Sequence, residues 1–387
     1  MAILNFNLDI RQGKINRFTF TIKKSMLKKL DWYIIKKFLS TFFFTVLIIT
    51  MISIIIDFSD KVEDFIEEPV TMKQIIVDYY LNWVLWINGL LFPLGVLIAV
   101  VFFTSRMAFN SEIISIFNAG VSFRRLMVPY LVAGGFLTAL HLIGNHYVIP
   151  RANETHYNFQ HTYIYHHSQK VNDANMHLFV GPNKKVYVEK YNKRDTSARN
   201  LRIEKVENNQ LTYLFKAGIA KWIGPPNKWK FKNYEVRTFN ENRESLLIEE
   251  GTELDTTLNL THLDFIYYNE DKEMMTTPHL LAFMKTRRQK GKGNLKKYET
   301  ELHRRTAEPF TILILTIIGL AVAARKVRGG MGLHLAIGVG IGALYIFLSK
   351  FSITFATNET LPPMLGVWMP NIIFFIVAVY LVSKAQK

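Results

Sequence analysis

The sequence predicts an α-helical membrane protein with six transmembrane helices, arranged as three plus three around an inserted all-β domain. Six apolar runs occur, each close to the ~20 residues that the hydrocarbon core of a bilayer requires. Between the third and fourth runs, residues 150–277 contain no spanning run, and apolar and polar residues alternate in short stretches. Lys and Arg flank the apolar runs, which is the charge pattern that orients membrane helices.

Composition excludes several classes of protein. Of the 387 residues, 49% are hydrophobic and 20% are charged, a mixture that indicates apolar spans joined to a polar domain. The net charge of +16 is compatible with nucleic-acid binding, but basic residues beside apolar runs favour membrane orientation and no nucleic-acid partner. Cysteine is absent, which excludes a disulfide, a thiolate metal site and a cysteine nucleophile. We expect no cofactor.

The N-terminal region, residues 1–31, is polar and basic and lacks the apolar core of a signal peptide. We expect either a basic cytoplasmic tail or an over-extended start, with the true beginning at Met26. The first span is expected over about residues 38–56. Lys36 and Lys37, at its start, suit side chains that extend toward the headgroups.

An acidic cluster over residues 57–65 marks the far end of the first span and indicates that this end faces outward. Lys61 is the basic exception within it. Its local interpretation is an ion pair with Asp57 or Asp64, one turn away on the same helix.

The second and third spans are expected over about residues 87–103 and 126–143. Pro93 interrupts the second span, and membrane helices tolerate such prolines where a neighbour satisfies the freed carbonyl. His141 and His146, near the exit of the third span, could indicate metal or proton chemistry. Because no carboxylate lies at ligand spacing between them, packing at the interface is favoured over ligation.

The loop between these spans, residues 110–120, is expected to form a short amphipathic helix. Asn110 or Ser111 could cap its start, Glu112 falls in the first turn where the helix dipole favours negative charge, and Gly120 suits a left-handed C-terminal residue. One face carries Ile113, Ile116 and Phe117, a neighbouring face carries Glu112, Ser115 and Ala119, and Ser122 suits the cap of the next helix. Such a helix either lies at the bilayer interface or is gripped by a soluble partner that moves the spans.

Residues 150–277 predict a β domain. Alternating stretches lie at residues 185–189, 201–206, 211–215 and 229–236, and turn signals rich in Gly, Pro and Asn separate them. Short alternating strands at this spacing are typical of an all-β sandwich or open barrel.

Residues 278–387 comprise a basic connecting segment and three further spans, expected over about 310–324, 333–351 and 365–382. Basic residues cluster at the N-terminus, beside Glu112, after the fourth span and at the C-terminus. With six spans these four places fall on one side, so both termini are predicted to be cytoplasmic and the β domain lies opposite.

The pattern Glu112-x6-Ala119-Gly120-x-Ser122, directly after a second span, resembles the short cytoplasmic helix of the LptF/LptG permeases. These are the membrane subunits of the lipopolysaccharide-export ABC transporter. The stretch 217–220 followed by Trp229, and the approach 298–309 to the fourth span, also resemble the family. Together with the order of spans and β domain, the resemblance covers nearly the whole chain from Met26.

The resemblance implies a bacterial inner-membrane location and a periplasmic β-jellyroll. It also implies a partner ATPase dimer that grips the coupling helix, a second LptF/LptG-type permease, a periplasmic bridge protein, and lipopolysaccharide among the membrane lipids. The expected ATPase-coupling residues are Glu112, Ile113, Ile116, Phe117, Ala119, Gly120 and Ser122. The candidates for contact with the substrate are Lys61, Lys36 and Lys37.

The sequence contains no Walker A motif, so a permease of this kind is expected to be non-catalytic and to rely on a separate ATPase. A membrane-anchored lipid-modifying enzyme is an alternative, with His141, His146 and Asp57 as candidate groups, but no HExxH or GxSxG motif supports it. A membrane-anchored β adaptor that transports nothing is another alternative, and it would not need the Glu112 helix. Co-purification of an ATPase would separate the permease from both.

Overall fold

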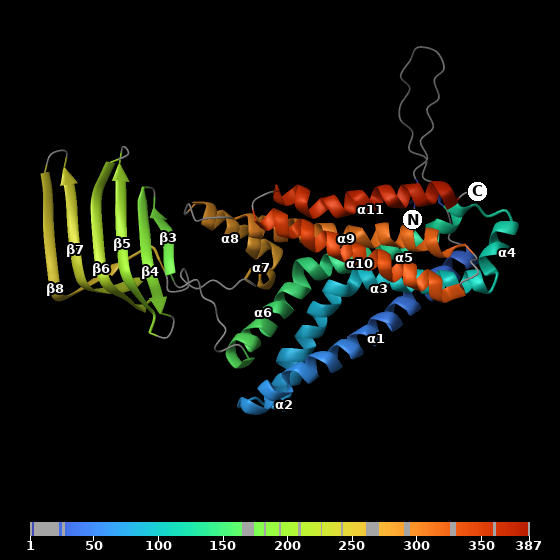
Figure 1. Ribbon diagram of the computed structural model, residues 1–387, viewed down its shortest axis with the longest axis horizontal. Coiled ribbons are helices and arrows are strands. Elements are labelled where there is room, and N and C mark those ends of the chain that lie inside the picture. Colours follow the sequence, from blue (N-terminus) through green and yellow to red (C-terminus); the bar gives the residue numbers. More distant parts are fainter. Residues whose placement is uncertain are drawn as a thin grey trace, which may run out of the picture.

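The computed structural model describes residues 2–3, 23–24, 28–164, 174–181, 183–192, 195–207, 210–225, 227–240, 243–260, 271–289, 295–325, 330–358 and 361–385. Most of the expected N-terminal tail lies outside these residues, apart from a two-residue pairing of β1 (Ala2–Ile3) with β2 (Lys23–Lys24). Six of the described helices are long and apolar enough to cross a membrane, and a six-stranded sheet separates the third from the fourth (Figure 1). The predicted three-plus-three fold is confirmed.

The first three spans are longer than the apolar runs that predicted them. Span one is α1 (Lys29–Glu67), and span two comprises α2 (Met72–Gln74), the π-helical turn η1 (Ile75–Tyr80) and α3 (Leu81–Phe109). The short helix α4 (Glu112–Asn118) follows. Span three comprises α5 (Phe123–Ile143), the π-helical turn η2 (Gly144–Val148), α6 (Ile149–Phe159) and the π-helical turn η3 (Gln160–Ile164). The β-domain boundary expected at residue 150 was therefore wrong, because residues 150–164 are helical. Buried Ala152, His156 and Phe159 recur at helical spacing in α6, a period that a search for spanning hydropathy does not detect.

The C-terminal region contains two short helices and three spans. In order they are α7 (Asp271–Met274), α8 (Thr277–Gln289), α9 (Lys296–Ala323), α10 (Gly330–Thr357) and α11 (Pro363–Ala385). We call the end of the helical region that contains α4, the start of α1 and the end of α11 the α4 end, and the opposite end, with α2 and the start of α9, the distal end (Figure 1).

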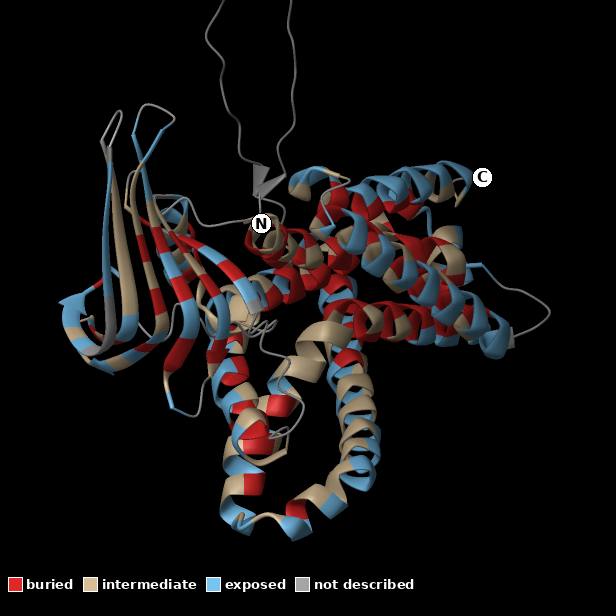
Figure 2. Cartoon of the chain, turned by 60° about the vertical axis from the view of Figure 1, so that its left-hand side comes forward, coloured by how far each residue is buried: buried red, intermediate tan, exposed pale blue. Residues whose placement is uncertain are grey.

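The sheet contains β3 (Ala174–Gly181), β4 (Lys184–Asn192), β5 (Ser197–Glu207), β6 (Gln210–Gly224), β7 (Lys228–Asn240) and β8 (Arg243–Thr257), all antiparallel and ordered as in the chain. The four expected strands lie within β4 to β7, and β3 and β8 form the edges. Val186, Val188, Leu201 and Ile203 are buried at every second position, as the alternating pattern predicts. The sheet is strongly bent (Figure 2), and on its apolar side the Trp229 indole donates to the Leu260 carbonyl at 2.8 Å.

The apolar core of the helical region gathers where α3, α5 and α9 pack together. Val100, Tyr130 and Leu320 are among its fully buried side chains. Beyond this core, the arm formed by the far half of α1 and the turn at α2 is mainly exposed or partly exposed (Figure 2).

Candidate functional site

The start of α4 is built differently from the sequence prediction. Ser111 occupies the cap position but has φ 62°, a left-handed conformation, and its side chain makes no capping hydrogen bond. Its carbonyl instead accepts from the Ser115 backbone N–H at 3.0 Å. Asn110 ends α3 and donates from Nδ2 to Glu112 Oε1 at 3.4 Å. The expected side-chain cap is absent because one left-handed residue here turns the chain directly from one helix into the next.

The end of α4 follows the sequence prediction. Gly120 has φ 82°, a conformation that a residue without Cβ adopts at little cost. Ser122 then caps α5, with its Oγ accepting from the Arg125 backbone N–H at 3.3 Å. Both turns are therefore fixed by local chemistry, and α4 is held at a defined angle between α3 and α5.

The two faces of α4 have opposite environments. Ile113 is completely buried in the core, and Ile116 and Phe117 pack against the same cluster. Ser115, Ala119, Gly120 and Ser122 are exposed, and Glu112 is partly exposed. The structure thus brings the seven predicted coupling residues together as one anchored stripe and one accessible face.

Two contacts that the sequence analysis missed tie α4 and α5 to the first turn of α1. Tyr33 donates from its hydroxyl to Glu112 Oε2 at 3.3 Å. Arg125 Nη2 lies 2.6 Å from Asp31 Oδ2, and the Asp31 side chain is 3% exposed. Asp31, an acid between lysines in the first turn of a predicted helix, was visible in the sequence as a candidate for an ion pair. Its partner could not be identified there, because Arg125 is 94 residues away in the chain.

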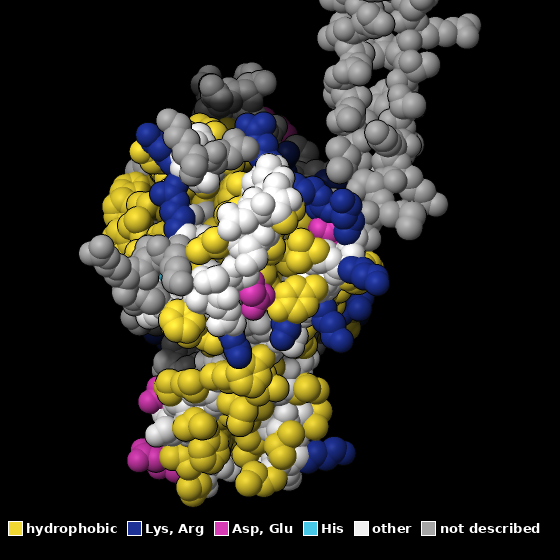
Figure 3. Space-filling model, turned by 90° about the vertical axis from the view of Figure 1, so that its right-hand side faces the viewer, with side chains coloured by type: hydrophobic (Ala, Val, Ile, Leu, Met, Phe, Trp, Pro, Cys, Tyr) yellow, Lys and Arg dark blue, Asp and Glu magenta, His cyan; other side chains and the backbone are white. Residues whose placement is uncertain are grey.

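The α4 end carries many basic side chains. Lys36, Arg106, Arg124, Arg325 and Lys384 are all exposed there. Figure 3 shows Lys and Arg side chains around this face and an acidic patch near its middle. This end of the protein therefore presents a mainly positive surface around a small negative centre.

The predicted substrate-contact lysines do not form one site. Lys36 and Lys37 are exposed near the start of α1, with Lys37 Nζ 5.9 Å from the centre of the Tyr33 ring. Lys61 lies about 36 Å further along the helix, at 1.5 Å per residue. Its Nζ is 3.9 Å from Asp57 Oδ1 and 5.3 Å from the centre of the Tyr79 ring. The local ion pair with Asp57 is therefore present, and the role of Lys61 in substrate contact stays a prediction.

The histidines near the third span have structural partners. His141 is buried, stacks on Phe92 with ring centres 4.6 Å apart, and places Nε2 3.1 Å from the Gly89 carbonyl. That carbonyl is the one freed by Pro93, four residues later, so His141 supplies the missing donor. His146 places Nδ1 2.9 Å from Thr277 Oγ1. Among the described residues no cluster of three His, Asp or Glu side chains is placed to hold a metal.

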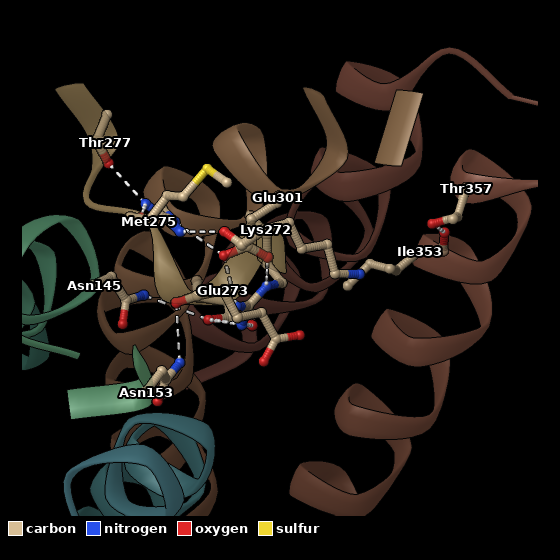
Figure 4. A network of polar contacts seen from close by, with 12 residues as sticks. Asn145, Asn153, Lys272, Glu273, Met275, Thr277, Glu301, Ile353 and Thr357 are labelled. Atoms are coloured by element: carbon tan, nitrogen blue, oxygen red, sulfur yellow. Dashed lines mark hydrogen bonds and ion pairs between the residues drawn. The ribbon is translucent and has the colours of Figure 1, made fainter. Parts of the chain in front are cut away.

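A buried polar network lies at the distal end (Figure 4). Glu301 accepts from Arg305 Nε at 2.9 Å and from Arg304 Nε and Nη2 at 2.8 and 3.0 Å. Arg305 also donates to the Lys272 and Met275 carbonyls, at 2.7 Å each, which fixes α7 to α9. Beside the network is a cavity of about 330 Å³ whose lining includes Trp86, Asn153, Glu273, Arg304 and Lys350.

Comparison with known proteins gave one family. The sequence model of the family described as lipopolysaccharide export system permease LptF/LptG matches residues 32–384. The matched part includes α4, both of its flanking spans and the sheet. A search of curated protein sequences found no match.

Proposed function

Because the chain belongs to the LptF/LptG family of lipopolysaccharide export permeases, we propose that it is the membrane subunit of an ABC transporter driven by a separate ATPase dimer. In this role it extracts lipopolysaccharide from the inner membrane and passes it to a periplasmic bridge. The observation that carries the proposal is α4, a helix between two spans whose apolar stripe packs against the core and whose other face is accessible.

The distribution of charge supports the orientation. Exposed Lys and Arg gather at the α4 end (Figure 3), and such residues favour the cytoplasmic side of a membrane. A soluble ATPase would then meet α4 directly. The sheet follows the distal end of the third span in the chain, so it belongs on the periplasmic side.

Glu112 is the proposed ionic contact with the ATPase. It is partly exposed at the first turn of α4, and it keeps acceptor capacity beyond its bonds to Tyr33 and Asn110, since a carboxylate has about four lone-pair sites. An Arg or Lys in a groove of the ATPase would complete the pair. Ala119, Gly120 and Ser122 are exposed nearby and offer small side chains to a partner.

The test is Glu112→Ala. Loss of one member of a desolvated charge pair costs about 2–5 kcal/mol, so the variant should release the ATPase on purification or hydrolyse ATP without export. Asn118→Ala, exposed on the same helix, is the matched control and should keep the ATPase. Full export with normal ATPase retention in the Glu112 variant would contradict the proposal.

Lys61 is the proposed contact for a lipid phosphate at the distal end, in competition with Asp57. An ammonium near a low-dielectric cavity attracts a phosphate more strongly than in bulk water. Lys61→Glu should abolish export and Lys61→Ala should weaken it, whereas a purely local ion pair predicts normal export in both. Photo-crosslinking from position 61 to lipopolysaccharide distinguishes the two. Lys350 in α10 is a further candidate, because a cation within an apolar span indicates a functional site.

The remaining partners are proposed from surfaces that the chain leaves uncovered. Among the six spans, α1 and α10 have the smallest shares of buried residues, so we assign them to face the second permease and the lipid. In the sheet, β8 is an edge strand with exposed Leu246, Leu247 and Ile248. Such an edge is able to pair with another strand, which suits the periplasmic bridge.

A further inference from the structure

We infer that the first turn of α1 belongs to the coupling element, so that a displacement of α4 and the base of α5 moves α1 with them. Asp31 and Arg125 are the positioning residues of this linkage, and Tyr33 supports it. The inference rests on the proposed docking of an ATPase at α4 and names the span that receives the motion.

Asp31 joins two helix starts. Its Oδ2 accepts from the Lys28 backbone N–H at 2.8 Å, which caps α1, and from Arg125 Nη2 at 2.6 Å, which lies in the first turn of α5. The carboxylate is almost completely buried, whereas the Arg125 side chain is 36% exposed. Breaking a buried ion pair leaves an uncompensated charge, so the two helix starts are expected to move together and not apart.

Tyr33 makes the second connection, two residues along α1. Its hydroxyl donates to Glu112, the residue proposed to bind the ATPase. The two contacts hold α4–α5 on both sides of the short loop that follows α4. A force applied to Glu112 therefore reaches α1 directly and also through Ser122, Arg125 and Asp31.

The burial of α1 explains why movement at its base matters. Its buried residues are Asp31, Ile34, Ile35, Phe38, Phe42 and, at the far end, Phe65. Five of these six lie in the first four turns. Four of the five belong to the same core cluster as Ile113 of α4, and the fifth, Asp31, bonds to Arg125 of α5. From Phe42 to Phe65 the helix continues for about 35 Å at 1.5 Å per residue. Most side chains on this stretch are exposed, and it contacts α3 through pairs such as Thr50 Oγ1 and Asn88 Oδ1, 2.8 Å apart.

α1 is held at its base and again at its far end, where Phe65 packs with Tyr79 and Phe159 and the Tyr79 hydroxyl donates to Asp57 Oδ2 at 3.0 Å. It therefore acts as a rigid connection that carries a displacement at the α4 end to the distal end, where Lys61 lies. ATP hydrolysis by a partner bound at α4 would thereby change the position of Lys61, although the ATPase and Lys61 are not in contact.

The test compares neighbouring arginines in the full assembly with its ATPase. Arg125→Gln removes the ion pair, Arg124→Gln removes an exposed charge on the same turn, and Arg125→Lys keeps the charge. We expect Arg125→Gln to retain the ATPase but to lose roughly 2- to 30-fold of lipopolysaccharide-stimulated ATP hydrolysis and export. Arg125→Lys should recover part of this loss, and Arg124→Gln should behave as the wild type.

Motion of α1 is measured with spin labels, which the absence of native cysteine makes straightforward. Ile66→Cys at the end of α1 and Leu365→Cys at the start of α11 are both exposed positions. A nucleotide-dependent change in the distance between the labels is expected in the wild-type background and should be lost with Arg125→Gln.

Each outcome has a separate meaning. If the wild-type chain binds no ATPase, the proposed function fails and the inference falls with it. If the ATPase binds but α1 shows no nucleotide-dependent motion, the inference alone is overturned. The same holds if the Arg125→Gln protein shows the same motion of α1 and the same export as the Arg124→Gln protein.

Discussion

The first and fourth spans, α1 and α9, differ in a way that reverses the rule for soluble proteins. α1 is the more apolar helix, yet most of its spanning part is exposed, whereas α9 is less apolar and the most buried of the six spans. In a bilayer, apolar side chains contact lipid at no cost, and polar side chains need partners within the protein. The comparison teaches that the interior position in this protein is marked by polar residues and not by hydrophobicity.

Several polar residues of α9 have hydrogen-bond partners at separate places along the helix. Glu301, Arg304 and Arg305 bond among themselves at the distal end. Further along, the Thr311 hydroxyl lies 2.6 Å from Tyr345 Oη of α10 and donates to Asn371 Oδ1 of α11 at 2.8 Å. α9 therefore holds its neighbours by directional contacts in the interior, whereas α1 makes such contacts near its two ends, as Asp31 does with Arg125 and Asp57 with Tyr79.

The largest expected effect on stability comes from removing a buried charge on α9. Arg305→Met removes hydrogen bonds to Glu301 and to the carbonyls of Lys272 and Met275, and should lower the free energy of unfolding by about 3–5 kcal/mol. Lys36→Met on exposed α1 should change it by no more than about 0.5 kcal/mol. Thermal melting of the two variants in detergent measures the difference, and equal melting temperatures would show that α9 is not the interior helix.

A matched pair of leucines sharpens the comparison with a purely apolar change. Leu315 on α9 is 0% exposed and Leu47 on α1 is 55% exposed. Leu315→Ala should cost about 2 kcal/mol, the lower part of the usual range, because lipid is as apolar as the core and packing contacts are the main loss. Leu47→Ala should be close to neutral. The same melting experiment in detergent and in lipid nanodiscs tests this, and a larger loss for Leu47→Ala would reverse the assignment of faces.

The smallest expected effect concerns α3, which is intermediate between the two extremes. His141→Leu leaves the Gly89 carbonyl without its donor, so the variant should be destabilised. With Pro93→Ala, residue 93 regains an N–H for that carbonyl, and His141→Leu should then cost less, by about 1 kcal/mol. A double-mutant cycle gives this coupling energy, and strictly additive losses would show that His141 does not serve the proline site.

The sequence by itself determined the six spans, the inserted β domain and the position of α4, the short helix between the second and third spans. These features depend on local chemistry, namely the length of apolar runs, alternation at every second residue, and the left-handed preference of Gly120 with the cap at Ser122. The family match over residues 32–384 agrees with that local pattern. The helical ends of the spans were missed because amphipathic turns beyond the apolar run, such as those of α6, do not raise hydropathy.

Only the tertiary structure decided which residues meet across long separations. The pairs Asp31 with Arg125, Tyr33 with Glu112 and His141 with Gly89 join residues 94, 79 and 52 positions apart. A charged or aromatic residue has many possible partners at such distances along the chain. The residues next to it in the sequence do not show which partner it contacts in the fold. Which faces of α1 and α9 point outward was decided in the same way, because a bilayer accepts an apolar face wherever packing leaves one uncovered.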